Sequence, residues 1–361
     1  MNHEHLYTIE WDAFGALAPG EKTRYLLRAD GNPFHTLFAQ QFDRAALDRL
    51  ITVENAIRQI AKTRAGSCFL RGQLAHKRAM LFFTQPSSRT FLSFLSACQI
   101  LGMRTGEVRD TATSSEFKGE SREDSVRTFS SYFDLIIMRS EEKGLAERMA
   151  WVLSNSERPI PVVNAGSGKD EHPTQALLDV YTLCRSFERA GGLRNRAVVF
   201  CGDLARGRTV RSLSRLLLQY ENIRQVFVAP QGLQIGADVQ EALRAAGVDF
   251  EMTDDLRAAI PGADAVYMTR VQDEWDLSRG ESAAIDTSRF VFGPAELALL
   301  RPKAIIMHPL PRRNEIAVEV DRDPRAMYWR QMRNGMWIRT ALIAETFCCA
   351  DRILDYFTQN M

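Results

Sequence analysis

Hydrophobic positions along the chain fall into two patterns. In Phe42–Lys62, apolar residues at positions 47, 50, 51, 57 and 60 lie near one face, which predicts an amphipathic helix. Short apolar runs bounded by turn residues predict buried strands. Seven such runs occur: Ala79–Phe83, Leu135–Met138, Pro161–Asn164, Val198–Cys201, Val226–Ala229, Ala265–Met268 and Ala304–Met307. Because these runs alternate with helix-length stretches, the predicted fold class is α/β, with parallel sheets covered on both faces.

The chain length and one change of pattern predict two domains. A chain of 361 residues is long enough for two, and Gly191-Gly192 separates one strand–helix series from the next. We expect each domain to be a parallel-sheet α/β sandwich, and helices to join them. The helical segment Gly335–Phe357 is expected to return to the first domain. The expected division is a polar, irregular N-terminal extension at 1–31, a first domain at 32–171 and 335–361, a linking helix at 172–190, and a second domain at 191–334.

Composition narrows the function classes. Lys+Arg number 46 and Asp+Glu 45, so the net charge of +1 argues against a general nucleic-acid binder. No apolar run approaches the roughly 20 residues of a membrane span, and the first 30 residues resemble no secretory signal. The six cysteines contain no CxxC pair, which argues against a redox dithiol or a zinc clamp. The cytoplasm is the expected compartment.

A candidate anion site follows the first predicted strand. Ser87-Ser88-Arg89-Thr90 leads into the apolar helix Phe91–Leu101, so hydroxyls, a guanidinium and backbone N–H groups meet at a helix N-terminus. Arg89 can bind a phosphate through two parallel hydrogen bonds. The alternative is that Ser87 or Ser88 only caps the helix and Arg89 is a solvated surface residue. The segment lacks the glycine spacing and the lysine of a P-loop.

With this loop, five motifs in order resemble the aspartate/ornithine carbamoyltransferase family over about residues 32 to 350. The first is Ser87–Thr90, which resembles the family's carbamoyl-phosphate loop. The others are Lys118-Gly119-Glu120-Ser121, Met138-Arg139, His172-Pro173-Thr174-Gln175 with Leu178-Asp179, and His308-Pro309-Leu310-Pro311-Arg312.

Within the family, two segments resemble the aspartate-specific branch. These are Gly202–Val210 and Tyr267–Gln272, and Pro309 stands where ornithine-specific members carry a cysteine. The resemblance implies transfer of the carbamoyl group of carbamoyl phosphate to L-aspartate, giving N-carbamoyl-L-aspartate and phosphate for pyrimidine biosynthesis. It implies no metal and no organic cofactor.

The resemblance also implies the residues that bind carbamoyl phosphate. Arg139 would bridge phosphate and carbonyl oxygens, His172 would donate a hydrogen bond to the carbonyl oxygen, and Gln175 would recognise the carbamoyl NH2 group. The implied set is Ser87, Ser88, Arg89, Thr90, Arg139, His172, Gln175, and the backbone carbonyls of Pro309 and Leu310. The residues expected to take part in catalysis are His172, Arg139, Thr90 and Lys118.

For aspartate, the implied ligands are mainly cationic. The set is Lys118, Arg208, Thr209, Arg270 and Gln272, with Arg208 and Arg270 each following a predicted strand. In the family, the loop that carries Lys118 reaches a neighbouring subunit, which implies a homotrimer with shared sites. Regulatory or dihydroorotase chains are further partners that the family allows, whereas no nucleic acid or membrane partner is expected.

Taken singly, several of these residues have ordinary structural interpretations. Arg139 could pair with Glu141 or Glu142, His172 could cap a helix or lie on the surface, and Arg208 could be a surface charge. The order of the motifs favours the functional interpretation. A dinucleotide site after Gly202 is not favoured, because the glycine spacing and the acidic ribose ligand are absent.

The sequence departs from the family pattern at three places. Phe91 replaces an arginine of the phosphate loop, Glu116-Phe117 precedes Lys118, and the extension at 1–31 has no counterpart in a minimal member. Two rival functions therefore stay open: a carbamoyltransferase for another amino acid or amine, and a non-catalytic assembly homologue.

Overall fold

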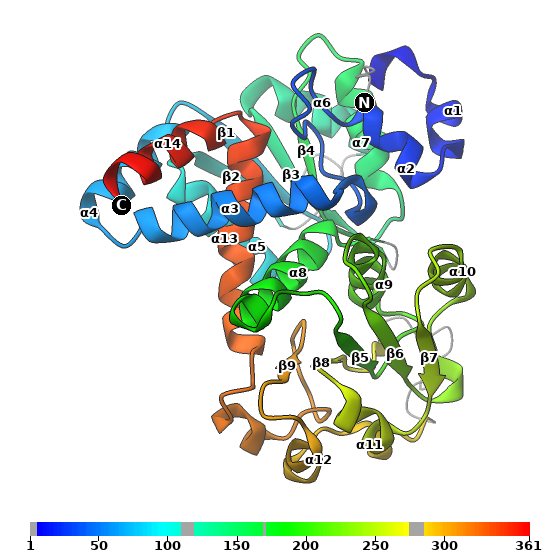
Figure 1. Ribbon diagram of the computed structural model, residues 1–361. Helices are drawn as coiled ribbons and strands as arrows, with labels where there is room; N and C mark the ends of the chain where they lie inside the picture. Colours follow the sequence, from blue (N-terminus) through cyan, green and yellow to red (C-terminus); the bar gives the residue numbers. More distant parts are fainter. Residues whose placement is uncertain (1–5, 110–118, 169–170, 274–284) are drawn as a thin grey trace. The chain divides into compact units, whose positions relative to one another are not determined.

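The computed structural model describes residues 6–109, 119–168, 171–273 and 285–361, and these form two compact units. Unit 1 comprises 1–174 and 335–361, and unit 2 comprises 175–334. The chain passes between the units inside two helices, α8 (Pro173–Phe187) and α13 (Tyr328–Thr346). Each unit contains a parallel sheet with helices, so the predicted α/β fold class is confirmed (Figure 1).

Unit 1 is built on a four-stranded parallel sheet in the order β2-β1-β3-β4. Its strands are β1 (Arg78–Phe83), β2 (Arg104–Val108), β3 (Leu135–Ser140) and β4 (Val162–Ser167). Its helices, besides the parts of α8 and α13 that it contains, are α1 (Trp11–Ala16), α2 (Pro19–Lys22), α3 (Arg44–Ile60), α4 (Arg64–Gln73), α5 (Ser88–Ile100), α6 (Arg122–Tyr132), α7 (Leu145–Ser154) and α14 (Ala350–Asn360).

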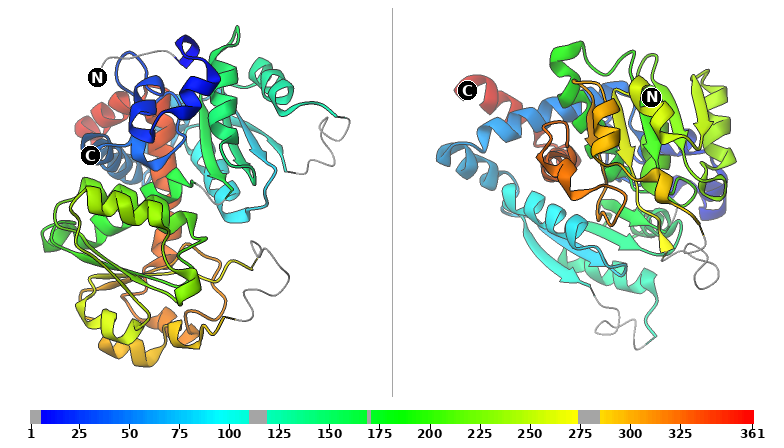
Figure 2. Two further views of the ribbon diagram at one scale, coloured as in Figure 1. Left: turned by 90° about the vertical axis from the view of Figure 1, so that its right-hand side faces the viewer. Right: turned by 90° about the horizontal axis from the view of Figure 1, so that it is seen from below.

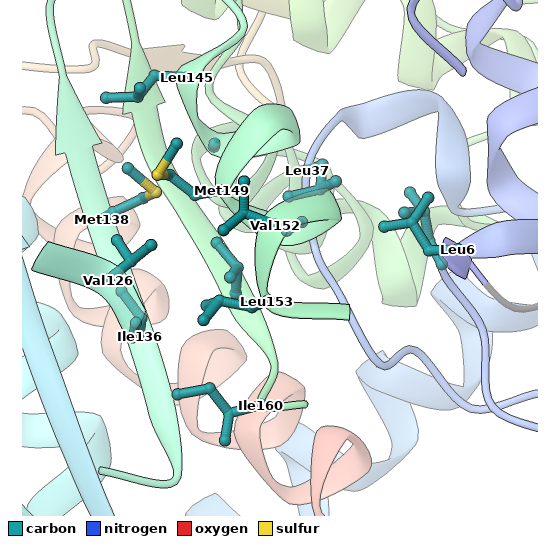
Figure 3. Packing of buried hydrophobic residues seen from close by; sticks show 14 of the residues in the cluster. Leu6, Leu37, Val126, Ile136, Met138, Leu145, Met149, Val152, Leu153 and Ile160 are labelled. Atoms are coloured by element: carbon teal, nitrogen blue, oxygen red, sulfur yellow. The ribbon is translucent and has the colours of Figure 1, made fainter. Parts of the chain in front are cut away.

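Alternating strand residues of unit 1 enter a hydrophobic core on one face of the sheet. Ile136 and Met138 of β3 pack with Val126 of α6 and with Met149 and Leu153 of α7 (Figure 3). The intervening residues of β1, β3 and β4 are buried as well. Burial on both faces explains why these strands are continuous apolar runs in the sequence.

Unit 2 contains a five-stranded parallel sheet in the order β7-β6-β5-β8-β9. Its strands lie between helices on both faces (Figure 2). The strands are β5 (Ala197–Cys201), β6 (Arg224–Val228), β7 (Phe250–Thr253), β8 (Ala265–Met268) and β9 (Ile305–Met307). The helices between them are α9 (Arg208–Leu216), α10 (Ala237–Ala245), α11 (Leu256–Ala259) and α12 (Pro294–Leu299).

Of the four edge strands, the sequence pattern predicted β4 and β9 but not β2 and β7. Strands β2 and β7 are mostly exposed, so neither forms an apolar run. Each pairs with a single neighbour, β1 or β6. The edge strands β4 and β9 are buried and do form apolar runs, so it is exposure that hides β2 and β7 from a search for hydrophobic runs.

The N-terminal segment is more ordered than its composition suggested. Instead of being irregular, it forms the short helices α1 and α2 and buries Phe14 and Leu26 in the core of unit 1. The Trp151 indole N–H donates to the carbonyl oxygen of Ile9 at 2.8 Å. Helices of 6 and 4 residues are too short to show a clear helical period in the sequence.

The C-terminal segment Gly335–Phe357 is helical and belongs to unit 1, as the sequence predicted, but it is divided between two helices. Helices α13 and α14 are separated by a turn in which Cys348 has a φ of 53°. Helix α14 then packs along α3 (Figure 1). No helix in the described ranges is long and apolar enough to cross a membrane.

Candidate active site

The candidate phosphate loop begins where β1 ends. Strands β1 and β3 pair in parallel with Phe83 opposite Arg139, and the Thr84 N–H donates to the Arg139 carbonyl oxygen at 2.9 Å. Helix α5 then starts at Ser88. The loop is therefore attached to the strand that carries Arg139.

Ser87 occupies the N-cap position of α5, but its side chain makes no capping hydrogen bond. This differs from α4, where the hydroxyl of Thr63 accepts the Gly66 N–H at 2.9 Å. Ser88 and Arg89 are exposed, whereas Thr90 is buried. The simple capping role considered for Ser87 is not what the structure shows.

Arg139 is buried at the carboxyl end of β3. It is 8% exposed, and its Nη1 donates to the carbonyl oxygen of Ala165 at 3.0 Å. Glu142, one of the two carboxylates considered as its partner, forms an ion pair with Arg122. The Arg139 side chain is thus positioned by a hydrogen bond to β4, the neighbouring strand of the same sheet.

His172 follows β4 at the same edge of the sheet. The Ser167 N–H at the end of β4 donates to the Glu171 carbonyl oxygen at 3.0 Å, so the chain turns back directly before His172. The imidazole is 4% exposed, which excludes the surface role for this residue. The ends of β1, β3 and β4, which are neighbours in one parallel sheet, thus carry Ser87–Thr90, Arg139 and His172.

The sequence analysis did not single out Arg339. Within unit 1, this residue links α5, which follows the candidate phosphate loop, to the start of α8, which follows His172. Its guanidinium is 2% exposed; Nη1 donates to Ser93 Oγ of α5 at 2.7 Å, and Nε lies 3.3 Å from Thr174 Oγ1 at the start of α8. A lone arginine within the mostly apolar run Met336–Ile343 of α13 is the signal that could have found it.

Within unit 2, a buried carboxylate orients Gln175. Asp179 is fully buried; its Oδ1 accepts Gln175 Nε2 at 2.9 Å and Gln331 Nε2 at 2.7 Å, and its Oδ2 accepts the Tyr267 hydroxyl at 2.7 Å. The Gln175 amide is therefore held by Asp179, and the Gln175 side chain also interacts with Tyr267. Burial, followed by the charge of Asp179, raises the pKa of Tyr267, so the phenol stays protonated.

The same network reaches the segment of Pro309 and Leu310. Gln331 Oε1 accepts the His308 N–H at 2.9 Å, and His308 Nδ1 accepts the Leu310 N–H at 2.7 Å. His308 Nε2, 2.7 Å from Glu315 Oε1, therefore carries the ring proton. These bonds fix the turn that presents the Pro309 and Leu310 carbonyls.

The two arginines proposed for aspartate follow neighbouring strands of the unit 2 sheet. Arg208 opens α9 after β5, and Arg270 follows β8. Buried Asp203 joins the two loops, because its Oδ2 accepts the Gln272 N–H at 3.0 Å and lies 2.9 Å from Arg206 Nε. The Tyr267 hydroxyl also interacts with Thr209, which connects this region to the Asp179 network.

Gly202 is required at the point where these loops cross. It has a φ of 120°, and a Cβ there would lie 2.1 Å from the carbonyl oxygen of Thr269. Any side chain would push the β5 and β8 loops apart. The remaining candidate, Lys118, lies outside the described residues, as do Glu116 and Phe117.

Comparison with known proteins agrees with this architecture. A model of the aspartate/ornithine carbamoyltransferase carbamoyl-P binding domain matches residues 35–185, and a model of the family's Asp/Orn binding domain matches residues 194–346. The chain therefore belongs to the aspartate/ornithine carbamoyltransferase family and is a transferase.

Individual relatives are of the aspartate type. The chloroplastic aspartate carbamoyltransferase of Arabidopsis thaliana is 42% identical over 308 residues, covering 84% of this chain and 75% of that protein. The aspartate carbamoyltransferase catalytic subunit of Vibrio cholerae is 42% identical over 272 residues, covering 75% and 85%. The structure of Trypanosoma cruzi aspartate transcarbamoylase in complex with N-(phosphonacetyl)-L-aspartic acid (PALA) is similar with a TM-score of 0.74 and 35% identity, covering 86% and 94%.

Proposed function

We propose that this protein is an aspartate carbamoyltransferase, which converts carbamoyl phosphate and L-aspartate into N-carbamoyl-L-aspartate and phosphate in pyrimidine biosynthesis. The observation that carries the proposal is the grouping of Ser87–Thr90, Arg139 and His172 at the ends of three neighbouring strands. Relatives whose names and bound ligands specify aspartate support the same reaction.

The chemistry requires charge neutralisation and orientation. The aspartate amine attacks the carbamoyl carbon, the bond from that carbon to the phosphate oxygen breaks, phosphate leaves, and the amine loses a proton. Arg89 and the N–H groups at the start of α5 neutralise the phosphate, with Ser87, Ser88 and Thr90 as hydroxyl ligands. Arg139 and His172 stabilise the negative charge that develops on the carbonyl oxygen.

Recognition of the carbamoyl NH2 group is assigned to three acceptors. These are Gln175 Oε1 and the carbonyls of Pro309 and Leu310. The proposal is supported by the bond from Gln175 Nε2 to Asp179, which orients the Gln175 amide, and by the His308 bond that shapes the 309–310 turn.

The aspartate carboxylates are assigned to Arg208, Arg270 and Lys118, with Thr209 and Gln272 as hydrogen-bonding partners. Asp203 supports this assignment, because it holds the loops of Arg208 and Gln272 together. Carbamoylation assays with L-aspartate and L-ornithine test the substrate. Product with aspartate alone is expected, and failure to form carbamoylaspartate would refute the proposal.

Phe91 bears on the rival substrate. Its ring is 3% exposed, packs edge-on against Phe83 at 5.4 Å, and lies 4.4 Å below the Arg109 guanidinium. Phe91 thus serves as a packing residue, which favours aspartate over a changed amino acid or amine. The non-catalytic alternative is tested by calorimetry with PALA, since a chain without a substrate site would not bind it.

We further propose a homotrimer whose sites combine two chains, with Lys118 supplied by the neighbour. Mixing Lys118→Ala subunits with His172→Ala subunits should restore part of the activity, because some sites would then receive both native residues. No recovery in verified mixed trimers would place each site within one chain. Copurification from the source cell would show whether regulatory or dihydroorotase chains associate.

The cytoplasm is the proposed compartment. None of the six cysteines forms a disulfide, as is usual in a reducing compartment. Several plant relatives are named chloroplastic, so cell fractionation is the appropriate test.

A further inference from the structure

Unit 1 contains a cavity of about 620 Å³ that no substrate role explains. It lies between the N-terminal segment, α3 and the turn that joins α13 to α14, and α14 packs along α3 (Figure 1). Part of its wall, residues 23–33 together with Cys348 and Asp351, falls outside the ranges 35–185 and 194–346 that the family models match. The cavity is therefore built partly from the terminal segments of this chain.

Negative charge predominates in the cavity wall. Four carboxylates line it, those of Asp30, Asp43, Glu345 and Asp351, against one lining cation, Arg49. Arg49 is already shared between two of them, with Nε 2.8 Å from Glu345 Oε1 and Nη2 2.8 Å from Asp351 Oδ1. An anionic ligand would thus meet net repulsion.

One further cation lies close by and is also engaged. Arg28 Nη2 donates to the Thr346 carbonyl oxygen at 2.8 Å, and its guanidinium stacks on the Phe34 ring at 4.7 Å. Counting Arg28, carboxylates still outnumber cations around the cavity by four to two.

Glu345 is the polar group of the cavity wall that we consider as the ligand-binding residue. Its side chain is 3% exposed, and its Oε2 accepts no hydrogen bond from any described residue. Burial raises the pKa of this carboxyl, although Arg49 acts in the opposite direction. A buried carboxylate oxygen without a donor is unfavourable, and a ligand N–H group would relieve that cost.

We propose that this cavity binds a small organic cation, with its ammonium or amidinium group on Glu345 and its apolar body against Leu27, Phe42 and Leu50. The volume falls within the roughly 300–1,000 Å³ range of small-molecule pockets. The proposal does not depend on the carbamoyl-transfer reaction, because none of the proposed substrate residues lines the cavity.

Calorimetric titration of the full-length protein with 2-phenylethylamine tests the charge requirement. The matched neutral and anionic probes are 2-phenylethanol and 3-phenylpropionate. We expect one amine site per chain and at least tenfold weaker binding of the other two probes, with no competition from PALA. No amine binding at millimolar concentration, equal binding of the alcohol, stronger binding of the anion, or displacement by PALA would each overturn the proposal.

Two variants locate the site. Glu345→Gln should weaken amine binding at least tenfold, whereas Asp48→Asn, which alters an exposed carboxylate of α3 paired with Arg44, should not. Ala46→Trp keeps every charge but fills the cavity, so it should also abolish binding. Because it leaves Glu345 in place, it tests the site independently of any folding defect in Glu345→Gln. Unchanged affinity in both cavity variants would refute the assignment.

Proton linkage provides a second readout. Because the pKa of Glu345 is raised and a bound cation favours the ionised carboxylate, amine affinity should increase as the pH rises through that pKa. Titrations in buffers of different ionisation enthalpy should show proton release in the wild type and none in Glu345→Gln. The same proton release in both proteins would contradict the role of Glu345.

Discussion

The candidate phosphate loop of unit 1 and the Asp179 network of unit 2 differ in how their proposed substrate-binding side chains are positioned. Ser88 and Arg89 are exposed, and the Ser87 side chain makes no capping bond to α5. In contrast, Gln175 is bound to Asp179, which is fully buried. In the proposed assignment, exposed groups bind the charged phosphate, whereas the smaller, neutral carbamoyl group is recognised by acceptors fixed in a buried framework.

The largest effect should come from Arg89→Ala. Loss of a charge-assisted phosphate contact should lower kcat/KM for carbamoyl phosphate by roughly 1,000-fold. The free energy of unfolding should change by less than about 0.5 kcal/mol, because Arg89 is exposed. Steady-state kinetics and urea unfolding measure the two quantities. The control is Arg64→Ala, which alters an exposed arginine of α4. A large loss of stability in Arg89→Ala but not in Arg64→Ala would show that Arg89 also has a structural role.

Asp179→Asn should affect both stability and activity. Three donors meet at this carboxylate, so the asparagine NH2 must face one of them. We expect the free energy of unfolding to fall by about 2 kcal/mol, and kcat/KM to fall by up to about 100-fold as Gln175 is misplaced.

Thr182→Val is the matched control for Asp179→Asn. Thr182 is buried and accepts a hydrogen bond from Asn334 at 3.0 Å, outside the Asp179 network. It should lose stability with kcat/KM unchanged. Equal kinetic effects in the two variants would show that Asp179 has only a structural role.

The dependence of stability on pH should differ between the two units, because unit 1 contains a buried histidine, His35. His35 Nδ1 accepts the Val162 N–H at 3.1 Å, and Nε2 lies 3.0 Å from Ser154 Oγ, which defines a neutral ring. Burial, aided by the charge of Arg28, lowers the pKa of His35 from 6.5 to about 3. Its contribution to stability is present above pH 6.5 and is lost as the pH falls toward 3, by about 1.4 kcal/mol per pH unit.

The carboxyls of unit 2 with shifted pKa values, among them Glu315, titrate at lower pH. Burial acts to raise the pKa of Glu315, but the hydrogen bond from His308, together with backbone hydrogen bonds, brings it below the usual 4.5. Between pH 6.5 and 4.5 the His35 effect should therefore dominate, and His35→Asn should flatten the dependence of Tm on pH in this range. An unchanged slope would argue against the neutral His35.

The smallest effect should come from Ser87→Ala. Since the Ser87 hydroxyl does not cap α5, stability should change by less than about 0.5 kcal/mol, while KM for carbamoyl phosphate rises about tenfold through one lost hydrogen bond. Thr63→Ala is the reverse case: it removes a true cap of α4 and should cost about 1 kcal/mol of stability with no change in KM. A loss of stability in Ser87→Ala with a raised KM in Thr63→Ala would contradict both assignments.

The sequence by itself determined the α/β class and the central strands. Strands β1, β3, β5 and β8 are buried on both faces over most of their length, so each contains a continuous apolar run of at least four residues that can be recognised locally. The resemblance carried by the ordered motifs also singled out Arg139, His172 and Gln175 as candidate site residues.

Only the tertiary structure decided how those residues are held. Edge strands β2 and β7 are mostly exposed, and α1 gains its stability by packing on α7, so neither feature leaves a periodic signal. The partners Asp179–Gln331 and Thr174–Arg339 are separated by 152 and 165 residues. A hydrogen bond depends on distance and angle in the folded chain, and no local pattern encodes it; the cavity beside Glu345 exists for the same reason, because three distant segments enclose it.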